Sequence, residues 1–292
     1  MIERLRNIAA FRILFDIIAT LASLVFVSVF SGYISSRSLP RLRSRCAILG
    51  NGPSLRSALE ASEQYISTCD VVVTNDFPVT PEFHIIKPQY YYIIDNAFFE
   101  LSDGRAIYPR TLSICEALQA VDWDIHVFVP RKYKFVLESH INNNRVKFFY
   151  FNLTPCDGFD AIQFFLFRFG LALPYANNVL IPALIHAINS GYSEVYIYGA
   201  EHNWTSYFTL DEENRLCMAG QHYFSEAREK PRVWWKSQNV SLLVHEALYA
   251  LSLTFRAYHA IARYAKRRNV MIYNCTNNSL IDAFPKCLTS CR

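Results

Sequence analysis

The chain has 292 residues, 52% of them hydrophobic and 15% aromatic, which excludes a disordered protein and is enough for a packed core. The formal net charge of +4 is small, and much of the basic excess lies near the N-terminus, so we expect no nucleic-acid partner. The eight cysteines form no CxxC pair and show no metal-like spacing with histidine, so we predict no metal site.

Near the N-terminus lies an apolar stretch, residues 17–36, that carries no charge and has about the 20 residues that a helix needs to cross a bilayer. We predict a membrane anchor and basic linker over residues 1–45. An interfacial or re-entrant helix is the alternative, because hydroxyl side chains interrupt the stretch. The bias of basic residues favours a cytoplasmic catalytic domain, since three arginines precede the stretch and four follow it: Arg4, Arg6 and Arg12, then Arg37, Arg41, Arg43 and Arg45. A lumenal domain is the alternative, because five asparagines fit the glycosylation pattern: Asn152, Asn203, Asn239, Asn274 and Asn277.

The most informative stretch is Gly50-Asn51-Gly52-Pro53-Ser54, which follows the short apolar run 47–49. The pattern predicts a buried parallel strand, a tight turn and a helix over residues 56–65. In the turn, Gly50 and Gly52 can adopt positive φ and let the backbone come close to a ligand. Such a turn aims backbone N–H groups and the helix dipole at one point, which suits a phosphate. It lacks the third glycine of the dinucleotide fingerprint and the Gly-Lys-Ser/Thr of a P-loop, so a mononucleotide or nucleotide-sugar diester fits better. The alternative is a turn that only joins a strand to a helix.

Polar residues also follow the next two predicted strands. The run 70–74 ends in Asn75 and Asp76, and the run 90–94 ends in Asp95 and Asn96. Ligands of open α/β sheets bind outside the carboxyl ends of the strands, so we expect these side chains to lie near Gly52. Amide and carboxylate groups there suit recognition of a base and a ribose.

The rest of the chain continues the alternation of helices and strands. We predict a helix over 112–121, strands over 125–129 and 147–151, and a helix over 177–189 with Asn177 and Asn178 at its anion-holding N-terminus. A strand over 194–199 ends at Gly199 and is followed by Glu201 and His202. Residues 205–236 show no clean periodicity and predict a lid, and a long helix over 241–268 and a strand over 270–274 follow. The whole predicts an α/β fold: a Rossmann-like, mostly parallel sheet over residues 46–292 with helices on both faces, an irregular lid and an N-terminal membrane helix.

Several of these motifs, in the same order, resemble bacterial sialyltransferases of lipooligosaccharide synthesis. They are the turn 50–55, the strand end at Asn75, the helix before Gly191, the tip at 199–201, the pair His222-Tyr223, and residues 278–280. The turn is also similar to a wider group of proteins that includes pterin diphosphokinase-like members.

The first resemblance implies a Rossmann-like enzyme that transfers sialic acid or a related acidic sugar from a CMP-sugar to a surface glycan or glycolipid. It implies inversion at the sugar, no metal and no cofactor, and attachment to the bacterial inner membrane. The residues that would bind the nucleotide sugar are Gly50, Asn51, Gly52, Ser54, Asn75, Asp76, Asn96, Asn177, Asn178, Gly199, Glu201, Tyr223, Asn278 and Ser279.

The catalytic base is where this sequence departs from the family. The family has a His-Tyr pair followed one helical turn later by the histidine that acts as base, whereas Glu226 stands at the later position here. Transfer to a hydroxyl needs a base, and histidine has the side-chain pKa nearest to neutral. We therefore rank His222 first, His202 second and Glu226 third, and the alternative for either histidine is a structural or substrate-contacting role.

Two other functions stay open at this point, and so does a homo-oligomer. An ATP-dependent diphosphokinase would need carboxylates to hold magnesium, which Asp76, Asp95 and Glu201 could supply. The other is a non-catalytic, membrane-anchored nucleotide-binding module.

Overall fold

The structure is a computed structural model that describes residues 9–32, 38–99, 101–102, 105–106, 109–219, 231–237 and 240–287. Its centre is a seven-stranded sheet in which every neighbouring pair of strands is parallel, in the order β14-β8-β1-β2-β3-β6-β7. The strands are β1 (Arg45–Leu49), β2 (Asp70–Thr74), β3 (Tyr90–Tyr92), β6 (Ile125–Pro130), β7 (Val146–Phe151), β8 (Glu194–Tyr198) and β14 (Met271–Asn274). All seven predicted strands are confirmed. The prediction succeeds because runs of buried Val, Ile, Tyr and Phe are typical of a sheet covered on both faces.

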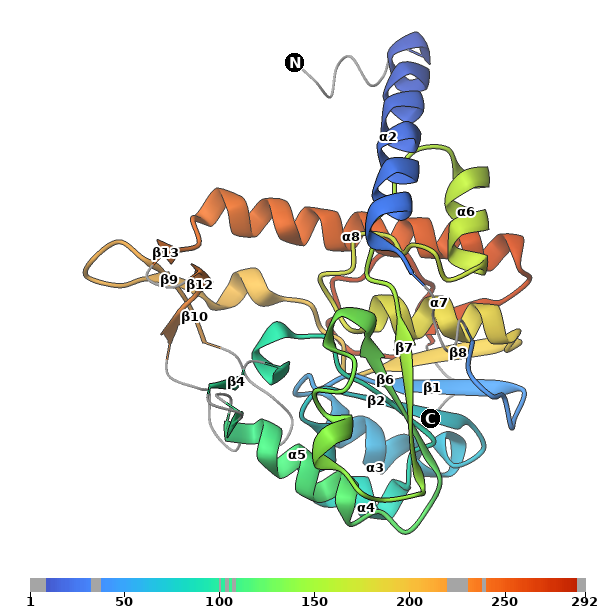
Figure 1. Ribbon diagram of the computed structural model, residues 1–292, viewed down its shortest axis with the longest axis vertical. Coiled ribbons are helices and arrows are strands. Elements are labelled where there is room, and N and C mark those ends of the chain that lie inside the picture. The colour runs from blue at the N-terminus through green and yellow to red at the C-terminus, as the bar shows by residue number, and fades with distance from the viewer. Residues whose placement is uncertain are drawn as a thin grey trace.

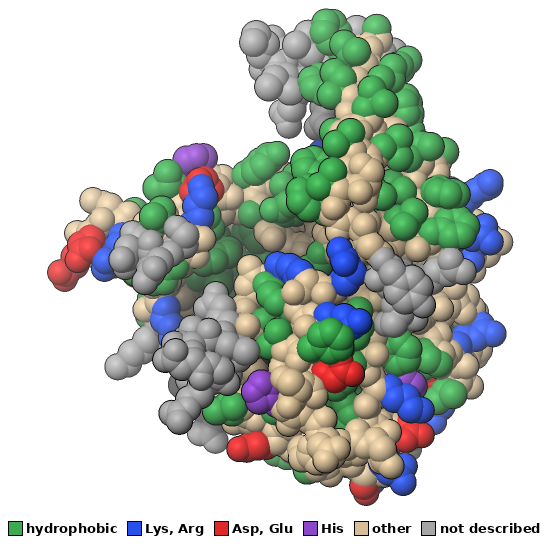
Figure 2. Space-filling view, viewed as in Figure 1, with side chains coloured by type: hydrophobic (Ala, Val, Ile, Leu, Met, Phe, Trp, Pro, Cys, Tyr) green, Lys and Arg blue, Asp and Glu red, His purple; other side chains and the backbone are tan. Residues whose placement is uncertain are grey.

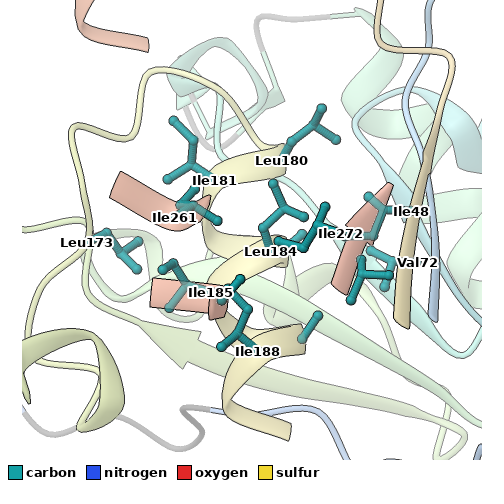
Figure 3. Packing of buried hydrophobic residues seen from close by; sticks show 14 of the residues in the cluster. Ile48, Val72, Leu173, Leu180, Ile181, Leu184, Ile185, Ile188, Ile261 and Ile272 are labelled. Carbon is teal, nitrogen blue, oxygen red and sulfur yellow. The ribbon is translucent and has the colours of Figure 1, made fainter. Parts of the chain in front are cut away.

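Helices cover both faces of this sheet, as predicted (Figure 1). They are α3 (Leu55–Ile66), α4 (Pro81–Ile86), α5 (Pro109–Gln119), α6 (Asp160–Arg168), α7 (Leu180–Ser190) and α8 (Val244–Arg267). Alternate strand residues face opposite ways: Ile48 and Val72 pack with α7 and α8, whereas Leu49 and Val73 pack with α3 and α5. Figure 3 shows the first of these two cores, in which α7 lies between the sheet and α8.

Two further features differ from the sequence predictions. The N-terminal helix α2 (Ala9–Phe30) begins earlier and ends earlier than the apolar stretch 17–36, and in Figure 1 it projects from the body of the molecule. The stretch 205–236 is not wholly irregular, because it contains short strands that form small antiparallel sheets: β9 (Phe208–Leu210), β10 (Leu216–Met218), β11 (Arg232–Val233) and β12 (Trp235–Ser237), the last paired with β13 (Val240–Ser241). Another two-stranded sheet joins β4 (Leu101–Ser102) to β5 (Arg105–Ala106).

Candidate functional site

The order of the sheet places a crevice beside β1. From β1 the chain adds β2, β3, β6 and β7 on one side and then returns to add β8 and β14 on the other. Ligands of open α/β sheets bind at such a switch point, outside the carboxyl ends of the strands. A cavity of about 200 Å³ lies there, lined by residues that follow β1, β2 and β8 and by the start of α7.

The Gly50–Gly52 turn has a different reason for its glycines from the one predicted. Neither glycine adopts positive φ. Instead, the Gly50 N–H donates to the carbonyl of Tyr198 and the Gly52 N–H to that of Gly199, both at 2.8 Å. An added Cβ on Gly50 would lie 2.4 Å from the Gly199 oxygen. The glycines therefore let the ends of β1 and β8 approach each other closely.

We expected the backbone N–H groups at the start of α3 to bind a phosphate, but in the structure they have partners within the chain. Besides the two glycine N–H groups, the Ser54 N–H donates to Oε1 of Glu201 at 2.7 Å and the Leu55 N–H donates to the carbonyl of Gly52 at 3.0 Å. The carboxylate of Glu201 takes the place expected for a phosphate, because the positive end of the helix dipole stabilises any anion there. The turn thus holds its own chain together.

Three buried acceptor oxygens around the cavity have no partner among the described residues: Oδ1 of Asn51, Oδ1 of Asn75 and Oε2 of Glu201. The amide of Asn51 is oriented by its Nδ2, which donates to the Thr74 carbonyl at 3.0 Å. Asn75 adopts a φ of 47°, in the left-handed region that asparagine tolerates better than most residues. A buried acceptor without a partner costs about 1–3 kcal/mol, so this arrangement favours a ligand that supplies hydroxyl or amino donors.

His202 lies in the wall of the same cavity and is buried. Its Nε2 is 2.7 Å from the hydroxyl of Tyr258, and that hydroxyl donates to Oδ1 of Asn178 at 3.2 Å. Because Tyr258 has one hydroxyl hydrogen, Nε2 of His202 carries the proton that completes this chain of bonds. Burial lowers the pKa of His202 to about 3, so the ring is neutral near pH 7 and is a weak proton acceptor.

The structure brings together eight of the predicted site residues around the cavity: Gly50, Asn51, Gly52, Asn75, Asn178, Gly199, Glu201 and His202. Ser54 joins them through its bond to Glu201. Three predicted residues, His222, Tyr223 and Glu226, lie outside the described residues.

Five predicted residues do not line the cavity: Asp76, Asn96, Asn177, Asn278 and Ser279. Asn96 follows β3, one strand beyond β2, and its Oδ1 accepts from Nζ of Lys132 and the hydroxyl of Tyr133. Ser279 donates to the carbonyl of Ala200 at 2.6 Å and so supports the cavity wall from behind. Asn177 is exposed and precedes α7, which begins at Leu180. At that helix start, Oδ1 of Asn178 accepts the Leu180 N–H at 2.9 Å and takes the place of the expected anion.

The cavity wall also contains residues that were not predicted from the sequence, among them Thr74, Trp204, Tyr207 and Met218. Trp204 and Tyr207 are aromatic residues in the short segment that follows β8, and the centre of the Trp204 ring lies 4.2 Å from that of His202. Aromatic residues at the carboxyl end of a strand were the signal that could have found them.

The carboxylates required by the diphosphokinase alternative do not converge. Asp95 is exposed and bonds to the Ala97 N–H, and neither Asp95 nor Asp76 lines the cavity beside Glu201. Within the described part of the chain, no three His, Cys, Asp or Glu side chains are grouped so that they could hold a metal ion.

No family model and no curated protein sequence matches this chain. Among solved structures it is similar to the MAf glycosyltransferase from Magnetospirillum magneticum AMB-1, with a TM-score of 0.51 and 12% sequence identity. The similarity covers 93% of this chain and 38% of the other, so this chain spans well under half of that protein's length. At this identity the likeness is one of fold, and the fold is one that a glycosyltransferase uses.

Proposed function

We propose that this protein is a membrane-attached glycosyltransferase that transfers sialic acid or a related acidic sugar from a CMP-sugar to a glycan or glycolipid. The fold shared with a glycosyltransferase supports the general reaction class. The observation that carries the proposal is the cavity at the switch point with its three unpartnered acceptors on Asn51, Asn75 and Glu201. The two ribose hydroxyls and the amino group of cytosine are donors of the kind that these oxygens lack.

The charge of the cavity supports a CMP-sugar over a sugar linked to UDP or GDP. No Lys or Arg side chain is among the described residues that line it, and Glu201 brings a carboxylate. At its nucleotide end a CMP-sugar carries a phosphodiester with one negative charge, whereas a nucleoside diphosphate sugar carries a pyrophosphate with two. Since burying an unpaired charge is costly, the single phosphate suits the nucleotide end of this site better, and the carboxylate of an acidic sugar would need a partner other than these lining residues.

The described walls would enclose only part of the donor, because ligand pockets usually reach about 300–1,000 Å³ and this cavity has about 200 Å³. We place the cytidine between Asn51 and Asn75 and the sugar toward Trp204 and Tyr207. The acceptor hydroxyl would then attack the anomeric carbon, the bond from that carbon to the phosphate oxygen would break, and CMP would leave with the electron pair. A single displacement of this kind inverts the configuration.

The base that takes the hydroxyl proton stays a prediction from the sequence, with His222 ahead of His202 and Glu226. The lowered pKa of His202 and its bond to Tyr258 favour a role in shaping the cavity wall. Replacing His222 with Ala should lower turnover about 10²- to 10⁴-fold with little change in CMP affinity, as measured by transfer of labelled sugar and by calorimetry. Normal turnover of this variant would move the base elsewhere.

Calorimetric titration of the full chain in detergent tests the nucleotide. We expect CMP to bind more tightly than UDP, GDP or ATP, and Asn51→Ala to weaken CMP about ten-fold through the loss of one buried bond. Asn96→Ala is the matched control, because Asn96 also follows a strand but lies outside the cavity, and it should bind CMP as the wild type does. Tighter binding of UDP or GDP, or equal losses in both variants, would contradict the CMP-sugar site.

Attachment to the membrane is proposed through α2. Residues Ala10–Phe30 have a mean hydropathy of 2.4 and are mostly exposed, so this helix is long and apolar enough to cross a bilayer. We propose that it holds the catalytic domain at the bacterial inner membrane, on the cytoplasmic side.

A further inference from the structure

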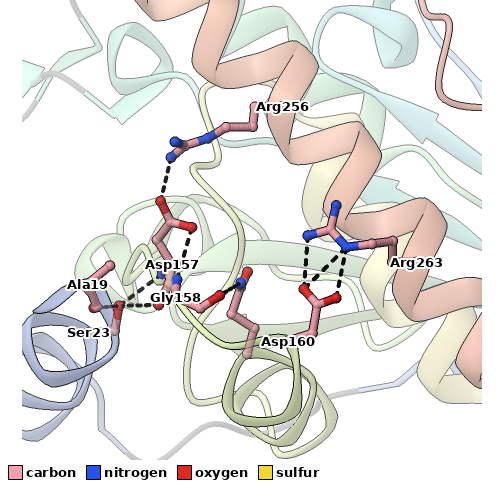
Figure 4. Close-up of polar contacts among 8 residues, drawn as sticks. Ala19, Ser23, Asp157, Gly158, Asp160, Arg256 and Arg263 are labelled. Atoms are coloured by element: carbon pink, nitrogen blue, oxygen red, sulfur yellow. Dashed lines mark hydrogen bonds and ion pairs between the residues drawn. The ribbon is translucent and has the colours of Figure 1, made fainter. Parts of the chain in front are cut away.

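The middle of α2 is bonded to a loop of the body. The hydroxyl of Thr20 accepts the Phe159 N–H at 3.0 Å. The hydroxyl of Ser23 accepts the Asp157 N–H at 2.8 Å (Figure 4). Gly158, with φ of 107°, packs so closely between them that an added Cβ would lie 2.1 Å from Oγ1 of Thr20. This loop leads directly into α6, so the start of α6 is fixed against α2.

Two further sets of contacts hold the segment that contains α6. Beyond α6, Oγ of Ser31 lies 2.5 Å from the carbonyl oxygen of Leu171. On the side of α8, Asp157 pairs with Arg256 at 2.7 Å and Asp160 pairs with Arg263 at 2.9 Å (Figure 4). Thus α2, α6 and α8 hold one another in a fixed arrangement.

The outer side of α6 is unusually apolar. Phe165 is 54% exposed, Phe159 and Phe169 are more than one third exposed, and the rings of Phe165 and Phe169 lie 4.7 Å apart. The inward side of the same helix is formed by Gln163, Leu166 and Phe167. We call the neighbouring rings of Phe165 and Phe169 the α6 aromatic face. Figures 1 and 2 show α6 beside α2 and hydrophobic side chains that cover α2 and continue onto the body next to it.

We propose that the α6 aromatic face enters one leaflet of the same bilayer that holds α2, the leaflet next to the catalytic domain. The proposal rests on the membrane attachment proposed above. With 22 residues, α2 is about 33 Å long, close to the roughly 30 Å hydrocarbon core of a bilayer. Thr20 and Ser23 stand near its middle, so a bilayer that covers α2 also meets the loop at Asp157 and the start of α6.

The chemistry of the contacts fits that position. Backbone groups inside a bilayer need partners within the protein, and the hydroxyls of Thr20 and Ser23 supply them to the loop. The carboxylates of Asp157 and Asp160 are each paired with an arginine, which lowers the cost of removing them from water. Arg168 ends the helix with its guanidinium 5.9 Å from the ring of Phe169, where it can reach lipid phosphate while the ring stays apolar.

Tryptophan probes in the full chain test the proposal. Phe165→Trp reports on the α6 aromatic face, Val25→Trp on exposed α2, and Ile85→Trp, at a residue 74% exposed on α4, is the control. Each variant is reconstituted into phosphatidylcholine vesicles whose acyl chains carry bromine near the headgroup end. Bromine quenches nearby indole fluorescence, so we expect quenching beyond the native level for the probes at 165 and 25 and none for the probe at 85.

The probes separate this proposal from the anchor itself. Quenching at 25 without quenching at 165 would overturn the α6 contact and leave the anchor intact. No quenching at 25 would remove the anchor, and quenching at 165 alone would support α6 as a membrane contact without it. Quenching at 85 equal to that at 165 would show contact without preference for α6 and would overturn the proposal. Tryptophan for phenylalanine at an exposed site keeps the apolar character, so the probe leaves the fold intact.

Discussion

At the scale of single residues, Gly52 packs directly against the side chain of Glu201 and leaves no room for a Cβ. An added Cβ on Gly52 would lie 1.6 Å from Oε2 of Glu201 and 2.8 Å from the carbonyl oxygen of Gly199. We expect Gly52→Ala to lower the free energy of unfolding by about 1–3 kcal/mol, as is usual for overpacking, and to weaken CMP binding through the neighbouring Asn51. Chemical denaturation measures the first effect.

A double-mutant cycle with Glu201→Ala checks the cause of this loss. Removing the carboxylate should recover part of the stability lost in Gly52→Ala, because the contact of the new Cβ with Oε2 of Glu201, the shorter of its two close contacts, is gone. Strictly additive changes would mean that the loss comes from the backbone of Gly199 alone.

Two buried histidines should make stability depend on pH. Burial lowers the pKa of both His186 and His202 to about 3, whereas an unfolded histidine titrates near pH 6.5. Between these values the unfolded chain binds protons that the folded chain does not, so stability falls as the pH falls from about 6.5 toward 3. Each such group contributes a slope of about 1.4 kcal/mol per pH unit.

The measurement is thermal unfolding of the protein from about pH 7 to about pH 5. His202→Asn should show a shallower dependence than the wild type, and asparagine tolerates the φ of 54° at this position. An exposed histidine, His245, supplies the matched control His245→Asn. An unchanged slope in His202→Asn would show that this side chain does not stay neutral over that pH range.

At the scale of elements, the sequence predicts what repeats and misses what is short. The strands of the large sheet are runs of buried apolar residues, and β2 is buried along its whole length. The strands β9, β10 and β11 have two or three residues each, too few for an alternating pattern to be visible. Helix α6 was missed because phenylalanines lie on both its inner and its outer side, which hides the period of 3.6.

The element α2 should lose its fixed position when its two mid-helix hydroxyls are removed. Thr20→Val and Ser23→Ala take away the acceptors of the Phe159 and Asp157 N–H groups, and each should lower the free energy of unfolding in detergent by about 1–2 kcal/mol. Ser28→Ala is the matched control, because among the described residues its exposed hydroxyl bonds only within α2, to the Val25 carbonyl at 2.8 Å. Losses in the control as large as those in the two test variants would argue against the contact with the loop.

At the scale of the whole molecule, the order of the strands decides which predicted residues meet. Asn51 and Asn75 follow β1 and β2, which are neighbours at the switch point, and both line the cavity. Asn96 and Asn278 follow β3 and β14, which lie one strand farther out on either side. The same local pattern, a polar residue after a strand, therefore succeeded or failed according to long-range pairing, which a single sequence does not contain.

The linker between α2 and the sheet is bonded to the body. The buried carboxylate of Asp70 accepts the N–H groups of Leu42 and Arg43 and the hydroxyl of Tyr192. Arg45 pairs with Glu194 at 2.8 Å. Basic residues predicted as part of a linker at the membrane edge thus hold the domain together, and a truncation that removes α2 must keep residues from 38 onward.

Deleting residues 1–36 should then separate folding from membrane attachment. The sheet begins at Arg45, so we expect the truncated domain to stay folded and to transfer sugar to soluble oligosaccharides at a rate close to that of the full chain. Transfer to glycolipid in vesicles should fall at least about ten-fold, because attachment to the same surface raises the effective concentration of the acceptor. The two acceptors are a membrane glycolipid extract and the oligosaccharides released from it, compared with a CMP-sugar donor. Equal losses on both would show that α2 belongs to the catalytic domain, and no loss on either would show that the acceptor does not depend on the membrane.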